Sequence, residues 1–400
     1  MSGRLRILFI SMEYPPETGG GGIGSYVATV APALAARGHD VHVLSCSPGQ
    51  EYRDYADQGV HIHRRGQVQI WGLGRIGLIL KAPQTVARLR SGLSTFLAYR
   101  RLKSEFDVIE YPDWGAEGWV LALFHSTPLV AHLHTPLPLI QWYNRMPMSH
   151  DVTWASFLEH FSVCRADAIT SSSQLLVKAL EKIGWLQELN VEVIPYPIDW
   201  IRWRNVRGVS STPPIVLFLG RLEPRKAPEV VAKAIVILRE EIQDAGALFV
   251  GKCSGCCDGL PYSEWVEMFA PGVSGCTYAE QVPRHELGDI LSRARVLAMP
   301  SWFESYGIVA LEAMAAGRPV VVTYTSGAAE FVERTGAGRT VPPGDHVALA
   351  ESLRPFLSDP EYAHQVGELA RAAVRQDLDP DKIAIQREIV YKRVSAAFAR

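Results

Sequence analysis

Strand-like and helix-like segments alternate along almost the whole chain, which has 400 residues. The strand candidates are short apolar runs, and longer stretches with the composition of helices separate them. Parallel strands need such helical crossovers, and the helices then cover both faces of the sheet. The alternation therefore predicts an α/β protein built from doubly wound parallel sheets. The strand candidates are 5–11, 41–44, 60–63, 108–111, 129–134, 168–171, 191–194, 215–219, 248–250, 296–299 and 319–323.

The alternation is interrupted near the middle of the chain. Pro195, Pro197 and the Ser-Ser-Thr-Pro-Pro run at 210–214 bracket an irregular stretch, which is typical of a linker between domains. A new buried strand, Ile215 to Leu219, follows at once. We therefore predict an N-terminal domain at 1–197, a linker at 198–214, a C-terminal domain at 215–379 and a final helix at 380–400.

The composition is that of an ordinary globular protein, with 48% apolar residues, 20% charged residues and a formal net charge of −2. This balance gives no reason to expect a nucleic acid as a partner. The apolar run Ile7 to Ile10 is too short for a cleavable signal, and no segment reaches the roughly 18 apolar residues of a spanning helix. Six cysteines fit free thiols in a reducing compartment, so we expect a cytoplasmic protein.

The segment 64–103 has a one-sided charge, with nine basic side chains and no acidic one. An apolar stretch, Ile70 to Leu80, lies within it. A basic helix beside exposed apolar residues can rest on the anionic inner face of a membrane, whereas a helix packed on the core exposes its basic side to water. The sequence favours the second interpretation and leaves peripheral membrane contact open. The basic residues are Arg64, Arg65, Arg75, Lys81, Arg88, Arg90, Arg100, Arg101 and Lys103.

The pattern that points most directly to chemistry is a pair of glutamates at a junction between a strand and a helix. Val296 to Met299 is an apolar strand candidate, and a helix is expected from Ile308 to Ala316. Glu304 lies in the loop between them, and Glu312 lies about one turn inside the helix. Gly307 lets the backbone approach a ligand, and the first N–H groups of the helix have no acceptor within it. Carboxylates beside such donors suit a polyhydroxylated ligand that carries phosphate.

This segment resembles the Glu-x7-Glu motif of retaining glycosyltransferases with the GT-B architecture, in particular those of family 4. The likeness extends over Glu-x-x-Gly-x-x-x-x-Glu-Ala and the following Gly-x-Pro-Val-Val. It implies two Rossmann-like domains that face each other across a cleft. It also implies that Glu304 contacts hydroxyls of the transferred sugar and that Glu312 holds the ribose of the nucleotide. The other donor-binding residues expected here are Tyr306, Gly307, Ile308 and Val309.

The loop at 220–227 resembles a second motif of the family, Gly-Arg-Leu-x-x-x-Lys-Gly. Arg221 and Lys226 have the spacing that family members use to bind the diphosphate. Two fixed cations would stabilise the negative charge that builds on the leaving diphosphate. The chain departs from the motif at Ala227, where glycine is usual, and Arg225 is a competing cation.

We expect no metal in the reaction, because two cations already face the diphosphate. The Asp-x-Asp triplets of the chain lie at 377–381, in a connector that we interpret as surface. A cluster of Cys253, Cys256 and Cys257 raises the alternative of a structural zinc. The only plausible further ligands, Cys276 and His285, match no standard spacing, so we expect an ordinary loop with free thiols.

A glycine-rich loop at 19–24 follows the first strand and opens a helix. Its spacing satisfies G-x-G-x-x-G, but a dinucleotide site also needs an acid at the end of the second strand, where Ser45 and Cys46 stand. The loop is more similar to the family-4 pattern, in which it approaches the diphosphate and the sugar. Gly21 and Gly22 are the matching positions.

The strand candidate Leu129 to His134 carries two histidines, His132 and His134, which its period of two directs to the same side. The resemblance implies that His134 lies beside the transferred sugar, where it binds a hydroxyl or steadies positive charge at the anomeric carbon. It is not expected to act as a general base. The catalytic candidates are thus His134, Arg221, Lys226 and Glu304. The acceptor-side candidates are His132, Asp113, Trp114, Trp142 and Tyr143.

The sequence therefore predicts a retaining, metal-independent glycosyltransferase that moves a hexose from a nucleotide-diphosphate sugar, with UDP or GDP as the nucleotide, to a hydroxyl acceptor. The resemblance places the acceptor on the N-terminal domain and folds the final helix back onto that domain. Three alternatives stay open: a nucleotide-sugar 2-epimerase, a sugar phosphorylase, and a non-catalytic subunit that binds a nucleotide sugar. The base, the sugar and the acceptor are not named by the sequence.

Overall fold

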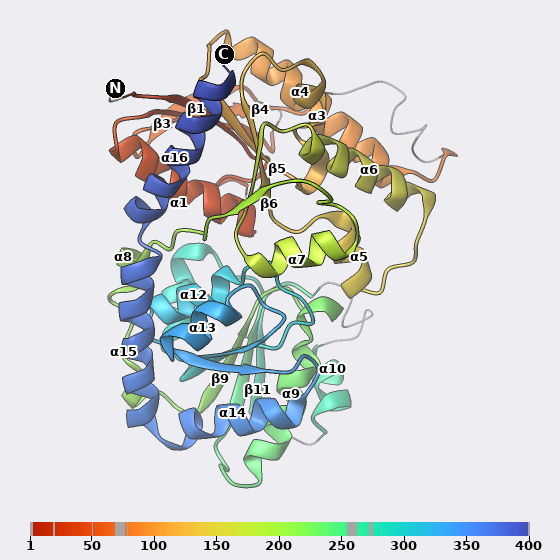
Figure 1. Cartoon of the computed structure of the whole chain (residues 1–400). Helices are drawn as coiled ribbons and strands as arrows, with labels where there is room; N and C mark the ends of the chain where they lie inside the picture. The colour runs from red at the N-terminus through yellow and green to blue at the C-terminus, as the bar shows by residue number, and fades with distance from the viewer. Residues whose placement is uncertain are drawn as a thin grey trace. The chain divides into compact units, whose positions relative to one another are not determined.

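The computed structural model describes residues 3–18, 21–49, 51–68, 77, 79–253, 262–271 and 275–398. The chain forms two compact units, each with its own sheet (Figure 1). The first unit comprises Met1–Trp142, Met146–Pro197 and Pro380–Arg400, and the second comprises Tyr143–Arg145 and Ile198–Asp379.

The first unit is built on an eight-stranded sheet with the order β3-β4-β2-β1-β5-β6-β7-β8. All neighbouring strands are parallel except β3 and β4, which form an antiparallel pair at the edge. Every strand predicted for this part of the chain is present. β3 was not predicted, because its mostly exposed sequence, Arg-Asp-Tyr-Ala-Asp, has no apolar run. The strands are β1 (Arg6–Ile10), β2 (Asp40–Cys46), β3 (Arg53–Asp57), β4 (Val60–Arg65), β5 (Val108–Pro112), β6 (Leu129–Leu133), β7 (Ala168–Ser171) and β8 (Val191–Val193).

Helices connect most of the parallel strands of the first unit, whereas the parallel neighbours β2 and β4 are connected through the antiparallel strand β3. The last helix of the chain also belongs to this unit and lies beside its first helix (Figure 1). The helices are α1 (Gly22–Ala36), α3 (Pro83–Leu102), α4 (Trp119–Phe124), α5 (Leu137–Tyr143), α6 (His150–Cys164), α7 (Gln174–Lys182) and α16 (Pro380–Phe398).

The second unit has a six-stranded parallel sheet with the order β11-β10-β9-β12-β13-β14. Its core is rich in valine, alanine and leucine from the strands and from the helices that cover them. Its strands are β9 (Ile215–Leu219), β10 (Gly246–Val250), β11 (Cys276–Ala279), β12 (Val296–Met299), β13 (Val320–Thr323) and β14 (Gly338–Val341). Its helices are α8 (Trp200–Trp203), α9 (Pro228–Arg239), α10 (Tyr262–Phe269), α11 (Leu287–Ser292), α12 (Ile308–Ala315), α13 (Ala329–Thr335), α14 (His346–Ser358) and α15 (Pro360–Asp377).

The segment 198–214 differs from the irregular linker that the prolines suggested. It contains α8 and the short 3-10 helix Val209–Ser211, and it forms part of the second unit. Trp203 and Val209 are 2% and 0% exposed, so the segment is anchored by apolar burial. Prolines near its ends therefore mark sharp changes of chain direction and not a free connector.

The basic segment 64–103 is less exposed than its charge suggested. Arg64 donates to the backbone carbonyl of Tyr14 at 2.7 Å, and Arg88 pairs with the buried Glu159 at 2.9 Å. Both arginines are buried, so neither is available to lipid headgroups. Most of the apolar stretch within the segment lies outside the described residues. No helix among the described residues is long and apolar enough to cross a membrane.

A buried charge network joins α16 to the sheet of the first unit. Arg387 of α16 is fully buried and pairs with Glu110 of β5 at 3.3 Å. Glu110 also accepts hydrogen bonds from the hydroxyls of Tyr26, at 2.7 Å, and Tyr391, at 2.6 Å. The guanidinium lies over the ring of Tyr26 and donates to Thr170 at 2.8 Å. Each side chain of the network thus has at least one partner, although Nε of Arg387 has none among the described residues, and this pairing lowers the cost of burying the charge.

We predict that Arg387→Met lowers the free energy of unfolding of the first unit by about 3–5 kcal/mol, because Glu110 is left as an uncompensated buried charge. The matched control lies on the same helix: Arg393 pairs with Glu192 at the surface, where its side chain is 56% exposed. Arg393→Met should cost ~1 kcal/mol or less. Urea unfolding of both variants measures the two values, and equal effects would contradict the assigned network.

Candidate active site

The candidate donor site is assembled at one edge of the sheet in the second unit. β9, β12 and β13 are adjacent and parallel, so the loops that follow them leave the sheet at the same edge. The loop after β9, called the clamp loop below, carries the predicted diphosphate-binding motif at 220–227. The loop after β12 carries Glu304 and Gly307. The topology therefore brings together two motifs that are about 80 positions apart in the sequence.

Glu304 is fixed by its backbone and by its side chain. Its amide donates to the carbonyl of Thr325 at 3.1 Å, and its own carbonyl accepts from the amide of Gly327 at 2.9 Å, so the loop after β13 holds it in place. Its carboxylate accepts a hydrogen bond from Lys226 and lies 3.4 Å from a guanidinium nitrogen of Arg225. The structure thus joins two of the predicted catalytic residues, Glu304 and Lys226, in one ion pair.

Burial alone would raise the pKa of Glu304, but Lys226 and Arg225 together outweigh it and hold the pKa below its usual value. Burial lowers the pKa of Lys226, and Glu304 opposes this shift. The carboxylate of Glu304 is therefore ionised near neutral pH, and Lys226 is its ion-pair partner. An ammonium group has three N–H donors, so Lys226 can bind a phosphate oxygen while it keeps its bond to Glu304.

The two arginines of the clamp loop have different environments. Arg225 is buried, donates to the carbonyl of Phe303 at 2.8 Å and pairs with Glu223 at 2.6 Å. It therefore positions the two loops, and it is not the free cation that competes for a ligand. Arg221 has a 55% exposed side chain and only a 3.3 Å contact to Glu223, so it can turn toward a bound anion.

Ala227 explains why the family usually has glycine at this position. The residue has φ 50° and ψ 50°, in the left-handed region that glycine enters without strain. Its side chain is fully buried, and the amide of Val230 caps the turn by donating to its carbonyl at 3.1 Å. The loop geometry is thus retained despite the substitution.

Gly307 begins α12 in a backbone conformation that requires glycine. Its φ is +94°, and a Cβ atom built on it would lie 2.7 Å from the terminal methyl of Met299. The helix that follows has its first amides, those of Ile308 and Val309, at the same sheet edge as the clamp loop. Among the described residues, no hydrogen bond uses these two amides. The helix start is therefore suited to bind an anion. Tyr306, predicted to bind the donor, is buried beside it.

Glu312 lies inside α12 and is buried against two arginines that the sequence analysis missed. Its carboxylate accepts from Arg284, in the turn after β11, and Arg202 of α8 is a second nearby cation. Burial raises the pKa of Glu312, and both arginines oppose this shift. Neither arginine belongs to a recognisable motif, so no signal in the sequence could have found them.

In the first unit, the predicted histidines lie in a group of aromatic rings at the carboxyl end of β6. The ring centroids of His132 and His134 are 4.8 Å apart, and Tyr26 is 4.7 Å from His132. His134 hydrogen-bonds to the hydroxyl of Tyr196. Burial lowers the pKa of His134 to about 3, and Arg387 adds to the effect. The ring is therefore neutral near pH 7.

The acceptor-side candidates are divided between the two units. Asp113 is buried and accepts from the amides of His134, at 2.9 Å, and Trp114, at 2.8 Å, so it positions the loop that carries the histidine. Trp114 packs under the guanidinium of Arg88. Trp142, at the end of α5, is 77% exposed in the first unit. Tyr143 belongs to the second unit, where its ring stacks on Phe303 at 5.0 Å.

Gly21 and Gly22 stand at the start of α1, as the glycine loop predicted. A Cβ atom on Gly21 would lie 2.6 Å from a carboxylate oxygen of Glu13, and Gly22 is exposed. Arg64 holds the preceding loop through Thr18, at 3.0 Å. The second strand ends at Ser45 and Cys46 without an acid, so the requirement of a dinucleotide site is not met.

The cysteine cluster differs in part from the prediction of free thiols. Cys253 is disulfide-bonded, whereas Cys46, Cys164 and Cys276 are free. The other members of the cluster, at 256 and 257, lie outside the described residues. Sparse cysteines in the sequence could not distinguish a disulfide from free thiols, because only backbone geometry decides whether two sulfur atoms can meet.

Two family profiles together match most of the chain. The profile described as Glycosyltransferase Family 4 matches residues 20–200, and the profile described as Glycosyl transferases group 1 matches residues 201–373. The glycogen synthase of Mycobacterium tuberculosis is 27% identical over 401 residues, which cover 97% of this chain and 94% of the relative. The chain belongs to the group 1 glycosyltransferases of GT-B architecture, enzymes that use nucleotide sugars.

Solved structures confirm the predicted fold class of two parallel-sheet α/β domains. Sucrose-phosphate synthase from Thermosynechococcus elongatus superposes with a TM-score of 0.76 at 22% identity, covering 98% of this chain and 100% of that chain. Anabaena HepE in complex with UDP-glucose superposes with a TM-score of 0.71 at 19% identity, covering 98% of this chain and 100% of that chain. At such identities the likeness establishes the fold alone.

We predict that Glu304→Gln lowers the thermal unfolding temperature most near neutral pH. Because the folded pKa of Glu304 lies below its unfolded value of 4.5, its carboxylate contributes stability above that value. The contribution is lost as the pH falls through the folded pKa, so the difference between the two proteins should narrow in acid. Calorimetry from about pH 7 to about pH 4 measures this difference. Glu351→Gln, at an exposed position, is the control. A difference that widens in acid would contradict the ion pair.

Proposed function

We propose that the protein is a retaining glycosyltransferase that moves a hexose from a uridine-diphosphate sugar to a carbohydrate hydroxyl without a metal ion. The observation that carries this proposal is the ion pair of Glu304 with Lys226, beside the exposed Arg221 and the start of α12. A fixed carboxylate, two cations and free helix amides meet at one sheet edge. The carboxylate suits the sugar hydroxyls of a nucleotide sugar. The cations and amides suit its diphosphate, including the negative charge that the diphosphate gains as it leaves.

Arg221 and Lys226 would bind the diphosphate and stabilise the charge that it gains when the sugar–phosphate bond breaks. The first amides of α12 add donors whose partial positive charge favours the same anion. Removal of one preorganised donor at a site of developing charge typically costs roughly 3 kcal/mol of barrier. Two fixed cations supply charge that a divalent metal would otherwise supply, which is the basis for proposing a metal-independent reaction.

Glu304 and Glu312 would bind the two polyhydroxylated parts of the donor. Glu304, ionised and neutralised by two cations, is a strong hydrogen-bond acceptor for sugar hydroxyls and a weak nucleophile. Glu312 would accept hydrogen bonds from the ribose hydroxyls, with Arg284 holding its carboxylate in place. Tyr306, Gly307, Ile308 and Val309 complete the proposed donor site.

The proposed chemistry is attack by the acceptor hydroxyl on the face from which the diphosphate leaves. The acceptor oxygen bonds to the anomeric carbon, the carbon–oxygen bond to phosphate breaks, and the leaving phosphate takes the acceptor proton. The anomeric configuration is thereby retained. His134 would contribute from the first unit as a neutral ring that binds a sugar hydroxyl. A neutral ring also avoids repulsion with positive charge at the anomeric carbon.

The identity of the donor and the acceptor class is proposed from the similar proteins. Anabaena HepE was crystallised with UDP-glucose, so we place UDP before GDP as the nucleotide. The names glycogen synthase and sucrose-phosphate synthase both describe the joining of carbohydrates, and they support a carbohydrate acceptor. The comparisons do not favour the epimerase, the phosphorylase or the non-catalytic subunit.

We predict that UDP and UDP-hexoses raise the melting temperature, while GDP, dTDP and ADP raise it less. A ligand at about 100 times its Kd stabilises the native state by about 2.7 kcal/mol, so the shift is easily measured by thermal-shift assay. The shift should persist in EDTA and disappear in Glu312→Ala. Glu351→Ala, at an exposed position of α14, is the matched control and should bind normally. No shift with any nucleotide would refute the donor site.

We predict that the reaction proceeds in EDTA and that the product keeps the α configuration of the donor. The reaction is measured with UDP-glucose and a panel of oligosaccharide and sugar-phosphate acceptors, and NMR coupling constants report the anomeric configuration. Assays without acceptor and without phosphate separate transfer from epimerisation and phosphorolysis. A β-configured product, or loss of turnover on chelation, would contradict the proposed mechanism.

A further inference from the structure

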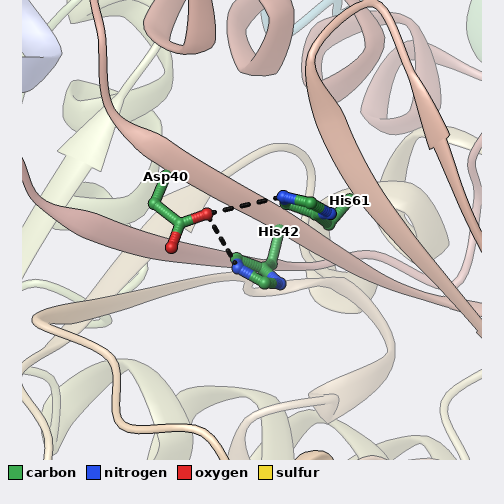
Figure 2. Close-up of side chains that lie close together, drawn as sticks. All are labelled: Asp40, His42 and His61. Atoms are coloured by element: carbon green, nitrogen blue, oxygen red, sulfur yellow. Dashed lines mark hydrogen bonds and ion pairs between the residues drawn. The ribbon is translucent and has the colours of Figure 1, made fainter.

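Three metal-ligating side chains converge on the outer strands of the first unit, away from the residues proposed for transfer. Asp40 and His42 lie on β2, and His61 lies opposite His42 on the neighbouring β4. Asp40 and His42 are two positions apart on one strand, so they point to the same face. Figure 2 shows one carboxylate oxygen of Asp40 facing both rings, with a dashed line to a nitrogen of each.

The donor atoms of the group are already close enough to share one ion. Oδ1 of Asp40 lies 3.1 Å from Nε2 of His42 and 3.6 Å from Nε2 of His61. One ligand atom from each of the three residues lies within 4.8 Å of the others. Zinc binds nitrogen and oxygen ligands at about 2.0–2.2 Å in a tetrahedron, which places the ligand atoms roughly 3.3–3.6 Å apart. The two distances to Asp40 are close to this range, and the ligand nitrogens of His42 and His61 lie within 4.8 Å of each other.

A second layer of hydrogen bonds orients His42 for binding. Nδ1 of His42 lies 2.9 Å from Nε2 of His63, and Nδ1 of His63 lies 2.8 Å from the carboxylate of Asp54. A carboxylate only accepts, so His63 donates to Asp54 and must in turn accept from His42. Nε2 of His42 then carries a lone pair. In metal sites, the nitrogen of a histidine ligand that does not bind the metal typically donates a hydrogen bond to a neighbouring acceptor.

The hydrogen-bond count leaves this series of side chains one donor short, a deficit that a bound cation would fill. Three contacts join Asp40, His42, His63 and Asp54 in sequence, but two neutral imidazole rings supply only two N–H donors. When His63 donates to Asp54 and accepts from His42, the lone pair on Nε2 of His42 faces the carboxylate of Asp40 at 3.1 Å. Two acceptors at this distance repel each other unless a cation lies between them.

The remaining surroundings hold the ligands without blocking the site. Nε of Arg6 donates to the other oxygen of Asp40 at 2.7 Å, which leaves Oδ1 directed at the rings. Phe106 packs edge-on against His42 at 5.2 Å. The side chains of Asp40 and His42 are each 13% exposed, whereas that of His61 is 54% exposed. An ion can therefore enter from the side of His61.

We propose that Asp40, His42 and His61 bind one zinc-like divalent transition-metal ion, with water in the fourth position. Imidazole and carboxylate ligands suit this class, whereas magnesium and calcium prefer oxygen ligands alone. The three residues lie toward the starts of β2 and β4, whereas His134 follows the end of β6. The starts and the ends of parallel strands lie at opposite edges of the sheet. The ion therefore cross-links two strands and stabilises the unit, and it takes no part in sugar transfer.

The test is isothermal titration calorimetry of the untagged full-length protein with ZnCl2, after EDTA treatment and removal of the chelator. One equivalent should bind, and the melting temperature should rise with zinc concentration. His61→Asn should weaken binding by more than about tenfold. Because His61 is half exposed, the metal-free variant should melt like the metal-free wild type. His285→Asn is the control, since its side chain is 78% exposed in the second unit and should leave binding unchanged.

Zinc bound elsewhere is the main competing outcome. The free Cys164 lies 3.1 Å from Nε2 of His160 and could bind zinc at the surface. Co2+ in place of zinc distinguishes the two, because the proposed site gives a tetrahedral visible spectrum without the near-ultraviolet thiolate band. Equal zinc affinity in His61→Asn and wild type, a thiolate band, or no binding at all would each overturn the proposal. UDP binding, measured on the same samples, tests the proposed function separately.

Discussion

Adjacent parallel strands end at the same edge of a sheet, and the candidate donor site depends on this constraint. Lys226 follows β9 and Glu304 follows β12, and the two strands pair directly although 78 positions separate the residues. No local sequence preference could bring these side chains together. The sheet order does so, and a third parallel neighbour, β13, supplies the loop that holds the backbone of Glu304. The chemistry of the site follows from the topology.

Once the loops meet, buried charge determines their geometry. Desolvating a carboxylate is costly unless it is paired, so Glu304 is stable in this position because Lys226 and Arg225 face it. Arg225 in turn needs Glu223, and the result is a rigid set of charges around the exposed Arg221. A site arranged before the ligand arrives spends little free energy on reorganisation during the reaction. The same logic places Arg284 against Glu312 in the neighbouring part of the unit.

The sequence predicted those parts of the fold and site that leave a local pattern. Apolar runs identified the central strands, because strands covered on both faces are continuously hydrophobic. The edge strand β3 and the short strands β11 and β14 are partly exposed and have no such run. Motif spacing singled out Lys226 and Glu304, which the structure joins in an ion pair, and Gly307, whose φ of +94° favours glycine; their roles stay a prediction. Arg284, Arg202 and Arg387 could not be found, because their roles depend on partners far away in the chain. The linker prediction failed similarly, since burial of Trp203 is a tertiary property.

The carboxyl edge of the sheet in the second unit and the amino edge of the sheet in the first unit favour ligands of opposite charge. At the carboxyl edge of the second unit, cations and helix amides favour an anion, which is the basis for the proposal that diphosphate binds there without a metal. Near the amino edge of the first unit, Asp40 and two imidazole lone pairs face one another and favour a cation. A chelator should therefore have separable effects on this protein. It would remove the proposed ion from the outer strands, while the charges proposed to bind the donor, all of them side chains and amides of the chain itself, would remain in place.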